Sequence, residues 1–266
     1  MARFKYLKGD SFLHRMDPTL KLVWNFVVVL TAVFNFDARY SAAWFLYVLL
    51  VALVLARIPL KQYLRALTAF LVFALFIAFW KTIYFSGEAH DIFVWGPIRI
   101  TQEGIAEGFS EFFRVLVISS LSIVFTLTTD PKRMVESIIQ IARVPYRIGY
   151  VAYATLRFIP LYENEAQVII NAHQIRGVGE TGKSLKSQFR LYRSLLVPLL
   201  VSGIRRAQAA AIAMDSRAFG AYDTRTAVEE VRAARTDVAF LAAHVLVCFV
   251  AFWYFILLGR GIQYFG

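Results

Sequence analysis

The feature that most constrains this chain is a series of long apolar blocks, each close to the length needed to cross a lipid bilayer. The hydrocarbon core of a bilayer is about 30 Å thick, and a helix of about 20 residues spans it. Blocks of this kind occupy the ranges 20–36, 41–58, 66–80, 112–129 and 238–258. The sequence therefore predicts an all-α integral membrane protein with about five transmembrane helices.

The overall composition agrees with a membrane protein. Hydrophobic residues make up 59% of the chain and the mean hydropathy is +0.57, whereas soluble domains are roughly 45–50% apolar. The formal net charge is nevertheless +11. In a soluble protein this excess would suggest a nucleic-acid partner, but in a membrane protein lysines and arginines gather in cytoplasmic loops and orient the spans. We therefore expect a lipid bilayer around the chain and no nucleic acid.

The distribution of charge predicts the orientation of the spans. The link at 57–65 carries three basic residues and no acidic one, whereas the stretch 81–111 carries five acidic residues against two basic ones. Because cytoplasmic loops are enriched in lysine and arginine, the N-terminus and the 57–65 link are expected in the cytoplasm and the 81–111 stretch outside. That outer stretch carries turn signals at 86–87 and 96–97.

A basic region separates the last two apolar blocks, so we divide the chain into an N-terminal membrane domain (1–129), a cytoplasmic region (130–236) and a C-terminal transmembrane helix (237–266). The region 130–236 contains sixteen lysines and arginines against nine aspartates and glutamates. It predicts a short helix to about residue 143, a long helix over 146–175 kinked at Pro160, a loop over 177–186, and a helix from about 191 with Pro198 near its start. The 146–175 helix is too polar to cross a bilayer, so it is expected at its surface, and no membrane span is expected between residues 163 and 220.

Catalytic and metal-binding motifs are missing from the sequence. Cys248 is the only cysteine, and the four histidines have no ligand partner at helical spacing. No Walker loop, dinucleotide fingerprint, HExxH or GxSxG motif is present. We therefore expect no catalytic residue, no metal site and no cofactor bound by the chain itself.

Two arginines end helix-like patterns within the basic region: Arg176 precedes Gly177, and Arg217 lies three residues before Gly220. Taken singly, each is explained by a cation near the last carbonyls of a helix, with glycine as the cap. Two neighbouring helices that end in the same way suggest a shared task. The planar fork of arginine is suited to bidentate pairing with carboxylates of a partner.

Five motifs follow one another along nearly the whole chain: Gly9-Asp-Ser-Phe-Leu-His-Arg-Met-Asp-Pro18 with Lys21-Leu22, Thr126-Leu-Thr-Thr-Asp-Pro131, Leu156-Arg-Phe-Ile-Pro160, Ala172-His-Gln-Ile-Arg176-Gly177, and Ala213-Met-Asp-Ser-Arg217-Ala-Phe219. With these motifs in this order, the chain resembles the transmembrane T-component of energy-coupling factor (ECF) transporters, the vitamin and metal importers of prokaryotes.

The resemblance implies a multi-pass protein of the prokaryotic cell membrane that couples two ABC ATPase subunits, a homodimer or a heterodimer, to vitamin or metal uptake by a separate membrane substrate-binding subunit. ATP would be bound by the ATPases. The docking motifs for the ATPases would be Ile175-Arg176-Gly177 and Ser216-Arg217-Ala218. We expect the substrate-binding subunit to face small or kinked positions on the two long helices, namely Phe158, Pro160, Pro198, Gly203, Ala207 and Ala210.

Two positions depart from the family pattern. Ala218 stands where the family usually has glycine, and if that position needs a positive φ, alanine costs about 1 kcal/mol or forces a different helix ending. Thr19 follows Asp17-Pro18 where the family commonly has arginine.

Three alternatives remain open. A conventional ABC importer permease couples through a Glu-Ala-Ala loop, and Glu165-Ala-Gln167 begins similarly but lacks the following glycine. A membrane-embedded enzyme acting on lipid head groups would need aspartates or histidines beside the arginines, and only Asp215 is near. The third alternative is an unspecialised membrane scaffold.

Overall fold

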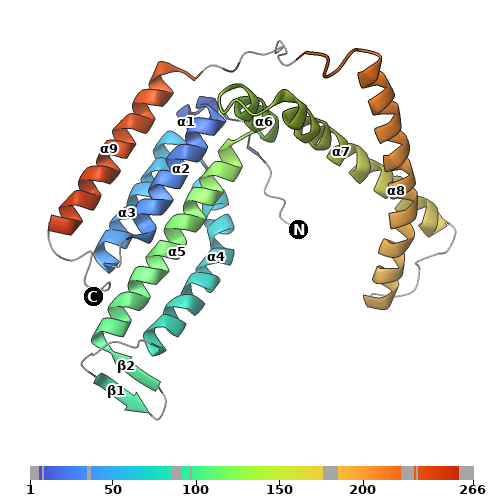
Figure 1. Ribbon diagram of the computed structural model, residues 1–266. Coiled ribbons are helices and arrows are strands. Elements are labelled where there is room, and N and C mark those ends of the chain that lie inside the picture. The colour runs from blue at the N-terminus through green and yellow to red at the C-terminus, as the bar shows by residue number, and fades with distance from the viewer. Residues whose placement is uncertain are drawn as a thin grey trace. The chain divides into compact units, whose positions relative to one another are not determined.

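The protein is almost entirely helical (Figure 1). The computed structural model describes residues 6–7, 9–34, 37–84, 91–95, 98–175, 185–222, 231 and 233–257. The elements in chain order are α1 (Phe12–Arg15), α2 (Pro18–Val33), α3 (Ala38–Leu50) continued by the π-helical η1 (Val51–Leu55), α4 (Leu60–Ile83), β1 (Asp91–Trp95), β2 (Ile98–Thr101), α5 (Gln102–Thr128), α6 (Pro131–Gln140), α7 (Tyr146–Ile175), α8 (Leu185–Asp215) and α9 (Arg235–Leu257). The predicted all-α class is confirmed, with one small hairpin in which β1 pairs antiparallel to β2.

The chain forms two compact units. The first contains residues 1–137 together with 231–266, and the second contains residues 138–230. The division falls inside α6, between Ser137 and Ile138. The terminal helix α9 belongs to the first unit, where it packs along α2.

Within the residues that the structure describes, five helical segments are long and apolar enough to cross a membrane, as predicted, but they are not the predicted five. They are Ala38–Leu55, Leu60–Ile83, Gln102–Thr128, Arg193–Asp215 and Arg235–Tyr254. The expected first span shortens to the 16 residues of α2, about 24 Å of helix. The segment Arg193–Asp215 of α8 is added, because the residues between Arg193 and Arg205 are apolar or small and an alanine-rich stretch follows Arg206.

The start of α5 corrects the predicted outer link. We expected the fourth span to begin at about residue 112, after the outer stretch, but α5 begins at Gln102, where the Thr101 hydroxyl caps it by accepting a hydrogen bond from the Gly104 N–H at 3.0 Å. The glutamates at 103, 107 and 111 repeat every four residues and therefore lie on one face of this helix. The predicted turn at 86–87 lies outside the described residues, as does the one at 96–97.

The core of the first unit lies where α2, α3, α4 and α5 meet. Its fully buried side chains include Trp24, Val48, Tyr63 and Leu121. The Tyr63 hydroxyl donates a hydrogen bond to Ser120 Oγ at 2.8 Å. A buried hydroxyl in an apolar core requires such a partner, so this bond fixes the register of α4 against α5.

In the second unit the sequence located α7 correctly and α8 only in part. The predicted helix over 146–175 is confirmed as a single helix that contains Pro160. Helix α8 starts at Leu185, several residues before the expected start, so Pro198 lies well inside it rather than near its beginning. The early turns were missed because they are polar, although lysine, glutamine and arginine are good helix formers.

Candidate functional site

The first predicted docking motif is only partly described. Ile175 is the last residue of α7 and its side chain is 88% exposed. Arg176 and Gly177 lie outside the described residues. The structure therefore places the end of the helix that carries this motif at an exposed position, and the role of the motif itself stays a prediction.

The second motif, Ser216-Arg217-Ala218, forms a helix-ending turn with two hydrogen bonds. The Phe219 N–H donates to the Met214 carbonyl and the Ala218 N–H donates to the Asp215 carbonyl, both at 3.0 Å. This 6→1 and 5→2 pattern is a Schellman motif, whose C′ residue adopts a left-handed conformation. Ala218 occupies that position with φ +50°. The alanine thus keeps the ending that glycine usually provides, at a cost of about 1 kcal/mol.

The residues after this turn are held against the start of α7. The Phe219 ring contacts the rings of Tyr146 and Tyr150, with centroids 5.5 and 4.9 Å away. The Arg147 guanidinium donates to the Gly220 carbonyl at 2.7 Å, and the Tyr146 hydroxyl donates to the carbonyl of residue 222 at 2.8 Å. The backbone on the C-terminal side of Arg217 is therefore fixed from two sides.

The Arg217 side chain itself is exposed. No described residue forms an ion pair with its guanidinium or accepts a hydrogen bond from it. An arginine on a fixed backbone, whose guanidinium has no partner in the part of the chain that the structure describes, is suited to binding a carboxylate or carbonyl of another protein.

Helices α7 and α8 run antiparallel and cross (Figure 1). Contacts at Tyr150 with Phe219 and at Glu165 with Arg206 show that residue numbers fall along α8 as they rise along α7. Ile175 lies 25 residues after Tyr150, which is about 37 Å of helix. Ile175, the described residue of the first motif, and the Ser216-Arg217-Ala218 motif consequently lie at opposite ends of the helix pair.

Four residues meet where the helices cross, and we call them the crossing cluster: Tyr162, Glu165, Gly203 and Arg206. Arg206 Nη2 donates to Glu165 Oε2 at 2.7 Å, and the same guanidinium lies 5.7 Å from the centre of the Tyr162 ring. A Cβ at Gly203 would lie 2.6 Å from the Tyr162 hydroxyl. Glu165 thus lies inside an unbroken helix with an internal partner, unlike the loop glutamate of a conventional permease.

The residues predicted to face a substrate-binding subunit are distributed over both long helices. Pro160, Pro198 and Ala207 are exposed, whereas Phe158, Gly203 and Ala210 are half-buried. Gly203 is turned toward Tyr162 of α7, so its open side is occupied by that ring. Around these positions α7 and α8 expose large apolar side chains, namely Ile148, Val151, Ile159, Leu161, Val168, Leu196, Val197, Leu200, Val201, Ile204 and Ile212. Contact with a partner at the predicted positions stays a prediction.

A buried polar network in the first unit was not foreseen. The Asp17 carboxylate caps α2 by accepting from the N–H groups of Thr19 and Leu20, and it also accepts from the Ser137 hydroxyl of α6 at 2.9 and 3.0 Å. The Asp17 N–H in turn donates to Asp237 Oδ2 of α9 at 3.0 Å. The Asp-Pro pair signalled the helix start, but nothing local indicated the two distant partners.

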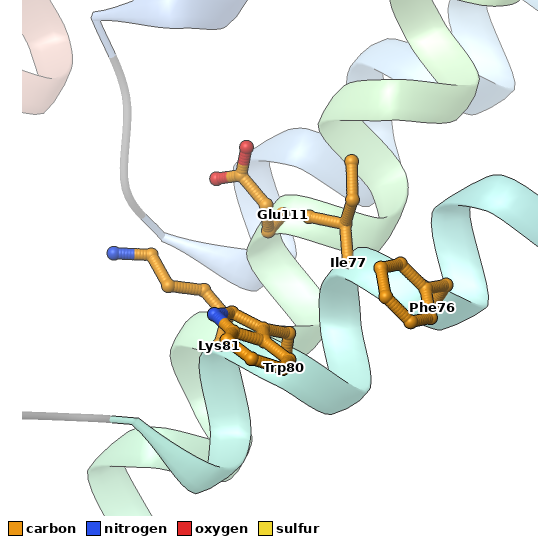
Figure 2. Close-up of a pocket in the computed structure, with 5 residues that line it drawn as sticks. All are labelled: Phe76, Ile77, Trp80, Lys81 and Glu111. Carbon is orange, nitrogen blue, oxygen red and sulfur yellow. The ribbon is translucent and has the colours of Figure 1, made fainter.

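A pocket of about 310 Å³ opens beside α4 and α5 (Figure 2). Phe76, Ile77, Trp80 and Lys81 line it from α4, and Glu111 lines it from α5. Both charges have partners elsewhere: Lys81 pairs with Glu107 at 3.4 Å, and Glu111 pairs with Arg114. The described residues also hold no group of three His, Cys, Asp or Glu side chains that could bind a metal ion.

Known proteins similar to this chain identify its family. The protein-family model described as "Cobalt transport protein" matches residues 9–228. Relatives named "Energy-coupling factor transporter transmembrane protein EcfT" include those of Limosilactobacillus fermentum, 34% identical over 93% of this chain and 94% of the relative, and Lactococcus lactis, 31% identical over 87% and 89%. The protein of that name from Streptococcus thermophilus is 30% identical over 84% and 86%. This multi-pass membrane chain therefore belongs to the family of energy-coupling factor transporter transmembrane proteins.

Proposed function

We propose that the chain is the non-catalytic scaffold of its transporter and that it couples ATP hydrolysis by two ATPase subunits to uptake through a separate membrane substrate-binding subunit. ATP is bound by the ATPases, and the chain needs no cofactor of its own. The observation that carries the proposal is Arg217: its backbone is fixed by the turn that ends α8, while its guanidinium is exposed and has no described partner.

The antiparallel arrangement of α7 and α8 supports two separate docking points. Phe219, two residues after Arg217, packs against Tyr150 near the start of α7, and Ile175 ends α7 about 37 Å along the helix from Tyr150. One ATPase subunit binds the Arg217 end and the other binds the end that carries Arg176. A homodimer or a heterodimer of ATPases satisfies this geometry equally.

The exposed apolar faces of α7 and α8 support a membrane partner. Side chains such as Val168 and Leu200 are 66% and 61% exposed. Helix faces that expose many large apolar side chains are typical of surfaces covered by a bilayer or another protein. The substrate-binding subunit contacts these faces around Phe158, Pro160, Pro198, Ala207 and Ala210, with Gly203 beneath the Tyr162 ring. The vitamin or metal is then chosen by that subunit.

The charge distribution supports the orientation. The region 130–236 has an excess of seven basic residues, so it lies with the N-terminus on the cytoplasmic side of a prokaryotic cell membrane. ATPase subunits that use cytoplasmic ATP then reach both helix ends.

The proposal is tested by co-expressing the chain with the ATPase subunits and the substrate-binding subunit encoded in the same genome. Arg217→Ala is made first, followed by Arg176→Ala and the double variant. Because removal of one partner from a hydrogen-bonded charge pair costs about 2–5 kcal/mol, we expect the double variant to bind the ATPases at least about 30-fold more weakly. The matched control is Arg205→Ala, which removes another exposed arginine of α8.

Two outcomes would contradict the proposal. The first is a double variant that still co-purifies with the ATPases at wild-type yield and keeps ATP-driven uptake intact. The second is a lipid-modifying activity in the protein purified alone, which would favour the enzyme alternative.

A further inference from the structure

We propose that the crossing cluster acts as a rigid joint in which Tyr162, Glu165 and Arg206 are positioning residues that hold α7 and α8 at a fixed angle. The angle stays fixed while force passes between the membrane and the docking ends, by which we mean the end of α7 at Ile175 and the end of α8 near Arg217. The role in transport rests on the proposed function. The rigidity of the joint is a property of the chain alone, so the two are tested separately.

The sequence spacing places each half of the cluster on one helix face. Tyr162 and Glu165 are three residues apart on α7, as are Gly203 and Arg206 on α8. Residues three apart are neighbours on a helix surface, so two complementary pairs meet at the crossing. Arg206 contacts both members of the α7 pair, the Glu165 carboxylate at 2.7 Å and the Tyr162 ring at 5.7 Å.

Gly203 lets the two helices approach. A Cβ at this position would lie 2.6 Å from the Tyr162 Oη but 3.5 Å from Cζ. Only the hydroxyl is too close, and the rest of the ring would be in ordinary contact with an alanine. Because Gly203 has no side chain, there is room for the Tyr162 hydroxyl against α8. The Tyr162 ring in this position provides the face over which Arg206 lies.

An exposed ion pair alone would not make a rigid joint, because solvent weakens it and its long side chains adopt many rotamers. Here the guanidinium is bound to a carboxylate at its edge and lies over an aromatic face, which together restrict its orientation. The Glu165 and Arg206 side chains are only 24% and 32% exposed. The combination explains why Arg206 is held in place whereas its neighbour Arg205 is exposed.

The crossing cluster lies at a similar distance from the two docking ends. Glu165 lies ten residues from Ile175 on α7, and Arg206 lies eleven residues from Arg217 on α8, so each docking end is a lever arm of about 15 Å. If the crossing angle were free to change, one end could move without the other. A fixed crossing makes the two ends move together.

The rigidity is measured on the purified full chain without ATPases. Spin labels are attached to Val168→Cys and Leu200→Cys, which are exposed positions on α7 and α8, in a Cys248→Ala background. We expect a narrow distance distribution between the labels, and a clearly broader one when Glu165→Gln is added. An equally narrow distribution in the Glu165→Gln chain would overturn the proposal.

A second pair of variants tests the joint without removing a charge. Gly203→Ala brings its Cβ against the Tyr162 hydroxyl, so we expect a broader or shifted distribution. Adding Tyr162→Phe removes the obstructing oxygen and keeps the ring face for Arg206, so the Gly203→Ala, Tyr162→Phe double variant should return to the narrow distribution. If the double variant is no closer to the wild type than Gly203→Ala alone, the assigned packing is wrong.

The role in coupling is measured in the assembled transporter. We expect Glu165→Gln and Arg206→Ala to lower ATP-driven uptake by roughly 2- to 30-fold while the ATPase subunits still co-purify at wild-type yield. Arg205→Ala is the control and should leave uptake unchanged. Wild-type uptake in both cluster variants would overturn this role. Failure of the wild-type chain to bind ATPases would instead refute the proposed function, and the spin-label result would still hold for the chain alone.

Discussion

The hydroxyl of Ser137 donates to the carboxylate of Asp17, with distances of 2.9 and 3.0 Å to its two oxygens, although the residues are 120 positions apart. Asp17 is 3% exposed and Ser137 is fully buried. The same carboxylate caps α2, so one side chain both starts the first long helix and holds α6. Ser137 is also the last residue of the first compact unit before the chain enters the second.

Removing this bond should destabilise the first unit. We expect Ser137→Ala to lower the free energy of unfolding by about 1.5–3 kcal/mol, because a buried carboxylate loses one of its hydrogen-bond donors. Thermal unfolding of the detergent-solubilised protein measures the change. Thr68→Ala is a suitable control, since that exposed hydroxyl binds only the Leu64 carbonyl of its own helix. Equal stability of the two variants would show that the Asp17–Ser137 bond contributes nothing.

Ala218→Gly should stabilise the end of α8. Alanine at φ +50° carries a penalty of about 1 kcal/mol that glycine does not. Slower amide hydrogen exchange at residues 218 and 219 would report the gain. The opposite substitution, Gly220→Ala, serves as the matched control: Gly220 has φ +91° and its Cβ would meet Arg147 at no less than 3.6 Å, so only backbone strain is added. Faster exchange in Ala218→Gly would contradict the left-handed conformation.

Gly108→Ala should disrupt the packing of α4 on α5. The new Cβ would lie 2.2 Å from Thr82 Oγ1 and 2.9 Å from the Ala78 carbonyl oxygen, and overpacking of this kind costs about 1–3 kcal/mol. Thermal unfolding again measures the loss. Adding Thr82→Ala removes one obstruction but leaves the backbone oxygen, so the double variant should recover only part of the stability. Full recovery would mean that the main chains are not in close contact here.

His14 should make stability depend on pH. Burial lowers its pKa below 6.5, the nearby charge of Lys21 acts in the same direction, and the Leu7 backbone and Asp10 oppose them. A lowered pKa means that the folded protein binds the proton less well than the unfolded chain, so this stabilisation is complete above pH 6.5 and is lost as the pH falls toward the lowered value. Unfolding measured from pH 8 to pH 5 should show the decline, and His14→Gln should reduce it. An unchanged pH dependence in the variant would rule out His14 as its source.

The membrane class and most helices were predictable because they depend on local properties. The length of each apolar block, the proline at 145 before α7 and the polar composition of the second unit are all visible along the chain. The prediction of α7 over 146–175 succeeded for this reason. The start of α5 was misplaced because its first turns carry glutamates, which resemble a solvent-exposed link unless their spacing of four is read as a helix face.

Some residues of the candidate sites could be identified from the sequence and others could not. The arginine at 217 and the departure at Ala218 were identified from the motif alone, and the structure added the positive φ that explains why glycine is usual there. Arg206 and Gly203 carried no comparable signal. Their importance depends on Tyr162 and Glu165, and the Glu165–Arg206 pair joins residues 41 positions apart.

By itself, the sequence determined that this chain is a helical membrane protein of the energy-coupling factor family, because hydropathy, helix propensity and motif spacing can all be read along the chain without knowing which residues meet in space. Only the tertiary structure decided that Asp17 binds Ser137, that Arg206 binds Glu165 across the crossing, and that Ile175 and Arg217 lie at opposite ends of α7 and α8. Such pairings depend on which helix faces meet, and the packing of the whole chain decides which faces those are.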